Sequence, residues 1–279
     1  MVNDNERDFM NSFQKLLKGL FSIKTDTTVQ EDKIENYNVL FISYDIVNST
    51  KFKNLFYDQW LDVLTNIFHD IQEDLEEKVK VIELWRMIGD EIVFVVKVND
   101  IDTLSKYIED IFTTMKNINE KIDNGKYFGK KNEKYLKNAK ESMIGLKSAA
   151  WIANLYDETK IKNLQLHEEY ENVFIRYTND RTDKITKVYE FLGNDIDAGF
   201  RIKQYTQKGR LIIGFELAYI LSEKTENNNF LHIIGYKKLK GVWNNKLYPI
   251  IWYHNDYKPI NEKFMDTFSF DAAEEDELI

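Results

Sequence analysis

The stretch Val81–Val96 reads VIELWRMIGDEIVFVV. Two short apolar runs, rich in β-branched and aromatic residues, flank a Gly-Asp pair, which is the pattern of a β-hairpin. The tip of this hairpin is unusual, because Arg86 ends the first run and two acids, Asp90 and Glu91, begin the second. A hydrophobic hairpin with a cation and adjacent carboxylates at its tip is more than a simple turn.

Composition limits the classes of protein to which the chain can belong. Its 279 residues are 43% hydrophobic, which is enough to form a substantial core. The absence of cysteine excludes disulfides, thiolate catalysis and cysteine-ligated zinc, and fits a reducing cytosol. A formal net charge of -9 argues against a general nucleic-acid or anionic-membrane binder. A nucleotide ligand remains compatible with this charge, because local geometry and a metal ion can outweigh it.

The sequence predicts a cytoplasmic protein of one globular domain. No apolar run reaches the ~18 residues of a membrane span, and the N-terminus lacks the order of a signal peptide. Residues 1–36 are expected to form an amphipathic helix and a connector, residues 37–254 the domain, and residues 255–279 an acidic tail. The helix is expected to dock on its own domain or on a second subunit, rather than on a membrane. The lysine-rich segment 124–140 is expected to be a solvated loop, with a phosphate-binding patch as the alternative.

Hydrophobic periodicity predicts the element order β-α-β-β-α-β-β-α-β-α-β-β within one α+β domain. Residues 37–47 are almost continuously apolar, as in a strand that is buried on both faces. Residues 55–78 and 102–122 have the spacing of amphipathic helices. The order predicts a ferredoxin-like core, in which an antiparallel-rich sheet carries flanking helices and the strand after the first helix can lie beside the first strand.

The first predicted strand ends in the sequence SYDIVNST. Asp45 closes this strand as a candidate metal ligand, and the backbone amides that follow could face phosphate oxygens at a helix N-terminus. Helix capping by Asn48 or Ser49 is the alternative explanation for these polar residues. Asp90, at the hairpin tip, offers a second carboxylate. Two aspartates on neighbouring strand ends suit two magnesium ions that also bind substrate phosphates.

Four segments resemble the motifs of class III nucleotide cyclases and occur in the order of that family. They are SYDIVNST, RMIGDEIV, GNDIDAGFRI and KLKGVWNNKLYPIIWY, and together they extend over about residues 37–253. The resemblance implies that residues 37–254 form a cyclase catalytic domain. It also implies a homodimer with shared active sites, each combining the metal ligands of one chain with base-binding and transition-state residues of the other.

The resemblance carries over to individual residues. It implies that Asp45 and Asp90, assisted by the carbonyl of Ile46, bind two divalent metal ions per site, Mg²⁺ or Mn²⁺. Arg201 matches the arginine that stabilises the transition state, a role that suits a fixed cation beside a phosphate gaining charge. The expected phosphate-binding residues are Asn48, Ser49, Thr50 and Lys240.

Three positions depart from the pattern of adenylate cyclases. Arg86 stands in place of a base-reading lysine, Glu190 in place of a base-reading aspartate, and Asp197 in place of the asparagine that assists the transition state. The longer side chains of Arg86 and Glu190 shrink the base pocket, which favours a pyrimidine over a purine. Tyr44 completes the expected base-binding set.

A narrower resemblance links these departures to the bacterial pyrimidine cyclases of the Pycsar antiphage system. It implies a soluble enzyme whose cyclic nucleotide activates a separate effector. We predict UTP as substrate, with cyclic UMP and pyrophosphate as products, since Arg86 could donate to a uracil carbonyl and Glu190 could accept from N3–H. Cytosine satisfies both side chains as well, so CTP is the first alternative. An adenylate or guanylate cyclase and a non-catalytic nucleotide-binding module are the others, and Asp197 favours the last.

Overall fold

The structure is a computed structural model that describes residues 36–56, 59–128, 143–157, 172–179 and 186–255. The expected N-terminal helix, most of the segment 124–140 and almost all of the acidic tail lie outside these residues. In the described part of the chain, no helix is long and apolar enough to span a membrane.

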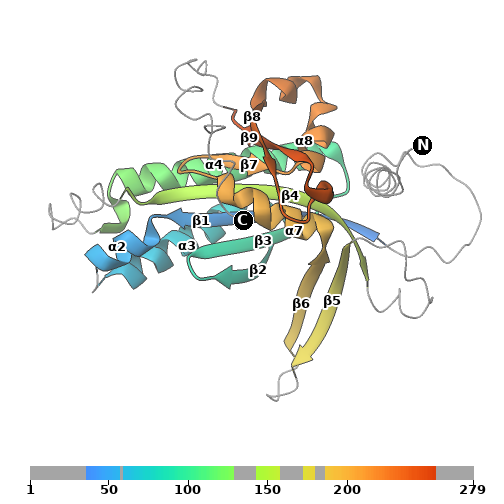
Figure 1. The fold of residues 1–279 in the computed structure, drawn as a ribbon. Helices are drawn as coiled ribbons and strands as arrows, with labels where there is room; N and C mark the ends of the chain where they lie inside the picture. The colour runs from blue at the N-terminus through green and yellow to red at the C-terminus, as the bar shows by residue number, and fades with distance from the viewer. Residues whose placement is uncertain (1–35, 57–58, 129–142, 158–171, 180–185, 256–279) are drawn as a thin grey trace, which may run out of the picture.

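Strands of the described residues form one sheet, and helices pack on both of its faces (Figure 1). The nine strands are β1 (Asn36–Val47), β2 (Glu83–Ile88), β3 (Glu91–Lys97), β4 (Gly145–Asp157), β5 (Asn172–Asn179), β6 (Thr186–Gly193), β7 (Leu211–Ile213), β8 (Leu231–Lys238) and β9 (Leu247–Tyr253). The α-helices are α2 (Ser49–Leu55), α3 (Trp60–Lys78), α4 (Ile101–Asp123), α7 (Asn194–Ile202) and α8 (Phe215–Ser222). Short 3₁₀ turns are η1 (Lys126–Phe128), η2 (Lys203–Tyr205), η3 (Thr225–Phe230) and η4 (Trp243–Asn245).

The strand order confirms the predicted ferredoxin-like core. The main path through the sheet is β2-β3-β1-β4-β7-β9-β8, and its first four strands pair antiparallel. One detail of the prediction is wrong: the neighbour of β1 is β3, whereas β2, the strand after the first helices, lies at the edge. The hairpin folds back after Gly89, whose positive φ of 64° favours glycine, and β3 rather than β2 then pairs with β1. The hairpin tip still arrives at the end of β1.

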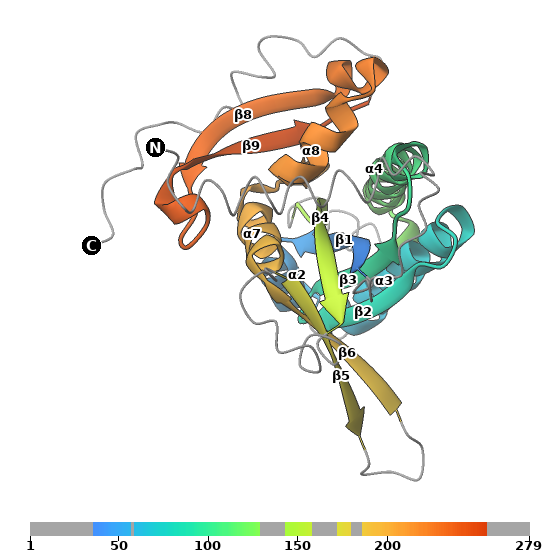
Figure 2. The same ribbon diagram turned by 90° about the vertical axis from the view of Figure 1, so that its right-hand side faces the viewer.

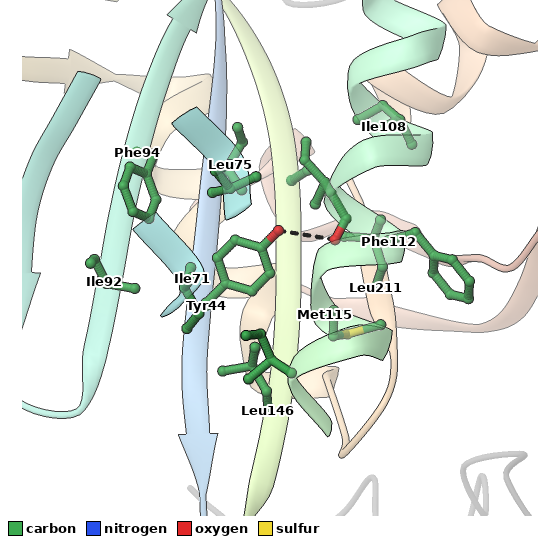
Figure 3. Close-up of a cluster of buried hydrophobic side chains, with 14 of the residues drawn as sticks. Tyr44, Ile71, Leu75, Ile92, Phe94, Ile108, Phe112, Met115, Leu146 and Leu211 are labelled. Atoms are coloured by element: carbon green, nitrogen blue, oxygen red, sulfur yellow. Dashed lines mark hydrogen bonds between the residues drawn. The ribbon is translucent and has the colours of Figure 1, made fainter. Parts of the chain in front are cut away.

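Alternation along β1 divides its side chains between two cores, as expected for a strand buried on both faces. Ile42, Tyr44 and Ile46 pack with α3 and α4 in the larger core, part of which Figure 3 shows. Phe41 points to the other face, where it stacks on Trp151 of β4 with ring centroids 5.5 Å apart. The apolar sequence of β1 therefore serves both faces of the sheet.

Two predictions about local elements need correction. The helical pattern of residues 55–78 is split, because α2 ends at Leu55 and α3 begins at Trp60. The predicted element order has one strand fewer than the described structure, because it does not include β6, which lies before α7 and pairs with β5 over its full length. This hairpin projects beyond the rest of the sheet (Figure 2). Most of its pairing is internal, so it lacks the apolar signal of a core strand. The helix predicted at 102–122 is confirmed as α4.

Helix α7 packs closely on β4. A Cβ atom at Gly199 would meet the indole ring of Trp151 at 2.1 Å, which is shorter than any normal contact. Trp151 also contacts Phe200, with ring centroids 5.3 Å apart, and Ile196 belongs to the same cluster. The glycine is required here because it lets the helix lie against the indole.

We predict that Gly199→Ala lowers the free energy of unfolding by about 2 kcal/mol, because the added methyl forces the helix and the indole apart. Urea unfolding followed by circular dichroism measures this. Trp151→Phe removes part of the indole. The double variant should therefore lose less free energy of unfolding than the sum of the losses of the two single variants. A Gly199→Ala variant within 0.5 kcal/mol of the wild type would contradict the packing argument.

Candidate active site

Polar side chains collect at the end of β1, on the face of the sheet opposite α3 and α4. Because Tyr44 and Ile46 face those helices, Ser43 and Asp45 face the other way. On the two neighbouring strands, Asp45 has Glu91 and Lys147 as its cross-strand neighbours. Ser43 donates a hydrogen bond to Glu91. The site therefore lies at one end of the face that α7 partly covers.

The structure brings Asp45 and Asp90 together, as the sequence predicted. The backbone N–H of Ile46 donates to the carbonyl oxygen of Asp90 over 3.2 Å, which holds the hairpin tip against the end of β1. The hydroxyl of Ser49 donates a hydrogen bond to the Asp90 carboxylate. Both aspartates are partly buried. Two carboxylates from separate elements thus share one end of the sheet.

The electrostatics of Asp45 show how much negative charge surrounds it. Burial raises the pKa of its carboxyl, the ammonium of Lys147 opposes that rise, and the carboxylates of Asp90 and Glu91 add to it. The Lys147 Nζ lies 3.2 Å from Asp45 Oδ2. A metal cation at this place would relieve the repulsion among the acids.

Glu91 is the cross-strand neighbour of Asp45 on β3, but it is turned to other partners. Its side chain is buried, it accepts a 2.6 Å hydrogen bond from Ser43 Oγ, and it forms an ion pair with Lys203. No group of three or more acid, histidine or cysteine side chains that could hold a metal occurs in the described part of the chain. The ion pair between Glu91 and Lys203 connects the start of β3 to the end of α7.

The residues after β1 do not cap α2 in the expected way. Asn48 occupies the N-cap position with a positive φ of 58° and makes no side-chain cap. Its amide donates instead to the carbonyl of Met143 over 3.3 Å. Ser49 is buried against Asp90, and Thr50 is exposed. The capping alternative is wrong for Asn48, while phosphate binding by these residues stays a prediction.

Arg86 and Glu190, which are 104 positions apart, form an ion pair between β2 and β6. Their side chains are 32% and 34% exposed, so the pair is partly open to solvent. The guanidinium of Arg86 also stacks on the Trp85 indole, 4.0 Å from its centroid, and burial lowers the pKa of Arg86. The two predicted base-binding residues thus meet in space.

Tyr44 does not belong with them. Its side chain is fully buried in the larger core, and its hydroxyl donates to the carbonyl of Ile111 on α4 over 2.9 Å (Figure 3). Burial raises the pKa of this phenol well above its usual value. We therefore correct the base-binding assignment of Tyr44: alternation along β1 turns it away from the face that carries Asp45.

Helix α7 carries the predicted transition-state residues. Asp197 is exposed in its first turn, and Arg201 lies one turn further on. The Nε of Arg201 is buried, and no described residue accepts a hydrogen bond from it. Asn172 anchors the start of the helix, because its side chain bonds both the backbone N–H and the carboxylate of Asp195. Arg201 therefore has a buried N–H donor that no described residue uses, on a helix whose start is anchored.

Lys240 is not brought to the aspartates within one chain. It is exposed in the connection between β8 and β9, before Gly241. Strands β4, β7 and β9 separate β8 from β1 in the sheet. Phosphate binding by Lys240 at the Asp45 site would thus require a second chain.

The sequence analysis assigned no function to three charged residues of this face. They are Lys147, Glu91 and Lys203. The signal for Lys147 and Glu91 lies in the register, since both are opposite Asp45 on adjacent strands. Register between distant segments is not visible in a single sequence. Lys203 follows α7 and gives no local signal of its contact with Glu91.

Comparison with solved structures identifies the fold. The adenylyl cyclase CyaB from P. aeruginosa matches with a TM-score of 0.55 and 9% identity, over 82% of this chain and 100% of that chain. The guanylyl cyclase Cya2 matches with a TM-score of 0.52 and 11% identity, over 81% and 97%. The guanylate cyclase domain of RhGC from Catenaria anguillulae, in complex with GTP, matches with a TM-score of 0.50 and 12% identity, over 79% and 98%. The fold is that of class III nucleotide cyclase catalytic domains. No protein-family model and no curated protein matches the sequence.

The raised pKa of Asp45 leads to a stability prediction for the metal-free protein. When the pKa of a carboxyl is higher in the folded than in the unfolded state, the free energy of unfolding of the protein falls as the pH rises from the unfolded-state pKa through the folded-state pKa. The ionised carboxylate therefore destabilises the fold at neutral pH. We expect Asp45→Asn to have an equal or higher Tm than the wild type at pH 7. This advantage should shrink as the pH is lowered, because a growing fraction of the carboxyl is then protonated.

Thermal unfolding with EDTA at several pH values measures the effect. Asp62→Asn removes an exposed carboxylate from the first turn of α3, where the helix dipole favours negative charge, so this control should not raise the Tm at pH 7. A variant Asp45→Asn that is clearly less stable than the wild type at pH 7 would show that the ion pair with Lys147 outweighs burial.

Proposed function

We propose that the protein is a nucleotide cyclase, which converts a nucleoside triphosphate into a 3′,5′-cyclic monophosphate and pyrophosphate. The observation that carries this proposal is the meeting of Asp45 and Asp90 at one end of the sheet, on a fold shared with solved adenylyl and guanylyl cyclase domains. The donor position of Arg201 on α7 supports it.

Two divalent metal ions, Mg²⁺ or Mn²⁺, fit the donors at this place. Carboxylate oxygens are the ligands that these ions prefer, and Asp45 lies in an excess of negative charge. The carbonyl of Ile46 and the phosphate oxygens of the substrate would complete the ligands. When bound, the ions would activate the 3′-hydroxyl and stabilise the leaving pyrophosphate.

The protein residues have distinct tasks in the proposed reaction. The 3′-oxygen attacks the α-phosphorus, the bond to the β-phosphate oxygen breaks, and pyrophosphate leaves with the electron pair. The 3′-hydroxyl proton passes to water. Arg201 donates hydrogen bonds to the α-phosphate as its negative charge increases. Asp197, four residues earlier on α7, would accept a hydrogen bond from the ribose.

The preferred substrate of the proposed reaction is UTP. In the free protein Arg86 and Glu190 bind each other, and a pyrimidine ring between them would replace that contact. Arg86 would donate to a uracil carbonyl and Glu190 would accept from N3–H. CTP is the alternative, since cytosine also satisfies both side chains. Through its resemblance to pyrimidine cyclases we assign the product to antiphage signalling in the cytoplasm, acting on a separate effector.

The proposed active unit is a homodimer with two shared sites. Lys240 lies in the connection between β8 and β9, and β4 and β7 separate these strands from β1 within one chain. A partner chain in head-to-tail arrangement would supply Lys240 and, as the resemblance implies, Arg201. The surface also offers apolar area for such a partner: large exposed apolar side chains occur on β2 and β6, namely Leu84, Met87, Ile88, Tyr189 and Leu192.

The substrate prediction is tested by incubating the protein with equimolar UTP, CTP, ATP and GTP and Mn²⁺, and separating the products by chromatography. We expect cyclic UMP to dominate. Dominant cyclic CMP would correct the base, and dominant cyclic AMP or GMP would contradict the pocket argument. No cyclic product from any of the four would favour the non-catalytic module, for which Asp197 is the supporting feature.

A paired substitution tests the pocket itself. Arg86→Lys combined with Glu190→Asp shortens both side chains to those of adenylate cyclases, so the share of cyclic AMP should rise several-fold. Asp62→Glu, on the exposed side of α3, is a charge-conserving control and should leave the product ratio unchanged.

Subunit mixing tests the shared site. We expect Asp45→Ala and Arg201→Ala each to lower turnover by at least about 100-fold, because each removes a group that stabilises the transition state. Mixed in equal amounts, the two variants should recover about a quarter of the wild-type activity, from one repaired site in each heterodimer. Two differently tagged chains verify the exchange of subunits. Absence of recovery in verified heterodimers would place the complete site within one chain.

A further inference from the structure

A β-bulge in β2 places two consecutive side chains on one face of the sheet. The pairing of β2 with β3 shifts register between Leu84 and Arg86, so Trp85 is the extra residue. Leu84 is opposite Phe94, which belongs to the larger core, whereas Arg86 is opposite Val93 and faces the other way. Trp85 packs in the aromatic cluster of that second face. In a regular strand the two side chains would point to opposite faces, so the bulge is what brings Trp85 beside Arg86.

The indole of Trp85 contacts both strands that carry the candidate base-binding residues. Its ring face lies under the guanidinium of Arg86, whose central carbon is 4.0 Å from the ring centroid. Its Nε1 donates a hydrogen bond to the carbonyl oxygen of Tyr189 over 3.2 Å, one residue before Glu190 on β6. One rigid ring system therefore joins Arg86 to the backbone that carries Glu190, in addition to the ion pair between their side chains.

The surroundings of the indole hold it in place. The ring makes edge contacts to Phe41 of β1 and Phe191 of β6, with centroids 5.6 and 4.9 Å apart. The ring of Phe200 on α7 lies 6.0 Å from it. Aromatic packing against three elements limits the movement of the indole, so its contacts to Arg86 and to the Tyr189 carbonyl cannot shift independently.

We propose that Trp85 is a specificity-determining residue, which sets the spacing between Arg86 and Glu190 and so limits the base site to the single ring of a pyrimidine. This inference rests on the proposed cyclase function and concerns base selection within it. A base that enters between Arg86 and Glu190 breaks their ion pair, so that pair cannot fix the spacing in the complex. The two contacts of the indole remain, because they use the face of the guanidinium and a backbone carbonyl. Trp85 thus acts on the base through its neighbours, as a positioning residue.

Two substitutions separate the contacts of the indole. Trp85→Phe keeps an aromatic face under the guanidinium but loses the N–H donor, whereas Trp85→Leu loses both. With equimolar UTP, CTP, ATP and GTP, the ratio of pyrimidine to purine cyclic products should fall about threefold in Trp85→Phe, the size of one hydrogen bond. It should fall about tenfold in Trp85→Leu, which also loses the cation–π contact. A residue with only a structural role would lower all four rates in parallel, and an unchanged ratio overturns the proposal.

Binding gives a second measure that does not require turnover. The dissociation constants of 3′-deoxy-UTP and 3′-deoxy-ATP, which lack the attacking hydroxyl, are measured by calorimetry with saturating Mn²⁺. The wild type should bind the uridine analogue more tightly, and this preference should shrink in both variants of Trp85. An equal preference in all three proteins, or a wild type that binds neither analogue or prefers the purine, overturns the proposal. A preference that depends on Trp85, without any cyclic product, supports the proposal and rejects only the cyclase.

Trp60 offers a matched control. It is a partly buried tryptophan with a lysine ammonium near its ring, Lys53 Nζ at 5.4 Å from the centroid, but it lies at the start of α3 on the opposite face of the sheet. Trp60→Leu should leave the product ratio and the binding preference unchanged. Arg86→Gln tests the route through the guanidinium: in this background Trp85→Leu should lower the ratio only about threefold, because only the Nε1 bond is left to lose. A full tenfold effect there overturns that route.

A measurement on the wild type does not depend on the folding of any variant. The proposal requires the bond from Trp85 Nε1 to the Tyr189 carbonyl to persist when the base is bound. In protein labelled with ¹⁵N-tryptophan, the indole N–H of Trp85 should exchange with water as slowly in the complex with 3′-deoxy-UTP as in the free protein. Faster exchange in the complex would show that the base releases β6 from the indole, and overturns the proposal.

Discussion

The position of β1 between β3 and β4 is the constraint on which the other features depend. Its alternating side chains complete a hydrophobic core on each face, and its ladder of hydrogen bonds fixes the register of both neighbours. A slip of one residue would exchange the faces, placing Asp45 in the core and Tyr44 at the site. Burial of large apolar side chains makes that slip costly, so the core itself determines where the carboxylates lie.

The same register produces a row of charges across the sheet. Lys147, Asp45 and Glu91 are cross-strand neighbours on β4, β1 and β3, and Lys203 adds a second cation from the end of α7. In this row each acid contacts one lysine, which limits the repulsion between carboxylates that the sheet places side by side. The pairs differ in burial: the Glu91 side chain is buried, whereas the Asp45 side chain is partly exposed. One acid is thus suited to holding α7 in place and the other to binding a ligand.

Much of the fold was predictable because its signals are local. The apolar run of β1, the hairpin at residues 81–96 and the periodicity of α4 each identify an element without reference to the rest of the chain. β6 was missed because it projects from the sheet and pairs mainly with β5, so burial imposes little pattern on it. The choice of β3 over β2 as the neighbour of β1 was also missed, since strand order depends on long-range pairing.

The chemical groups of the candidate site are recognisable in the sequence: acids at the end of the first strand and at the hairpin tip, and an arginine on a later helix. Motif spacing carries this information because each motif is a short segment. Which of these groups meet depends on the tertiary structure. It joined Arg86 to Glu190 across 104 positions, turned Tyr44 into the core and set Lys147 against Asp45. These contacts depend on the register and faces of a sheet whose strands are far apart in the chain, and a register is a property of pairs of segments rather than of any one of them.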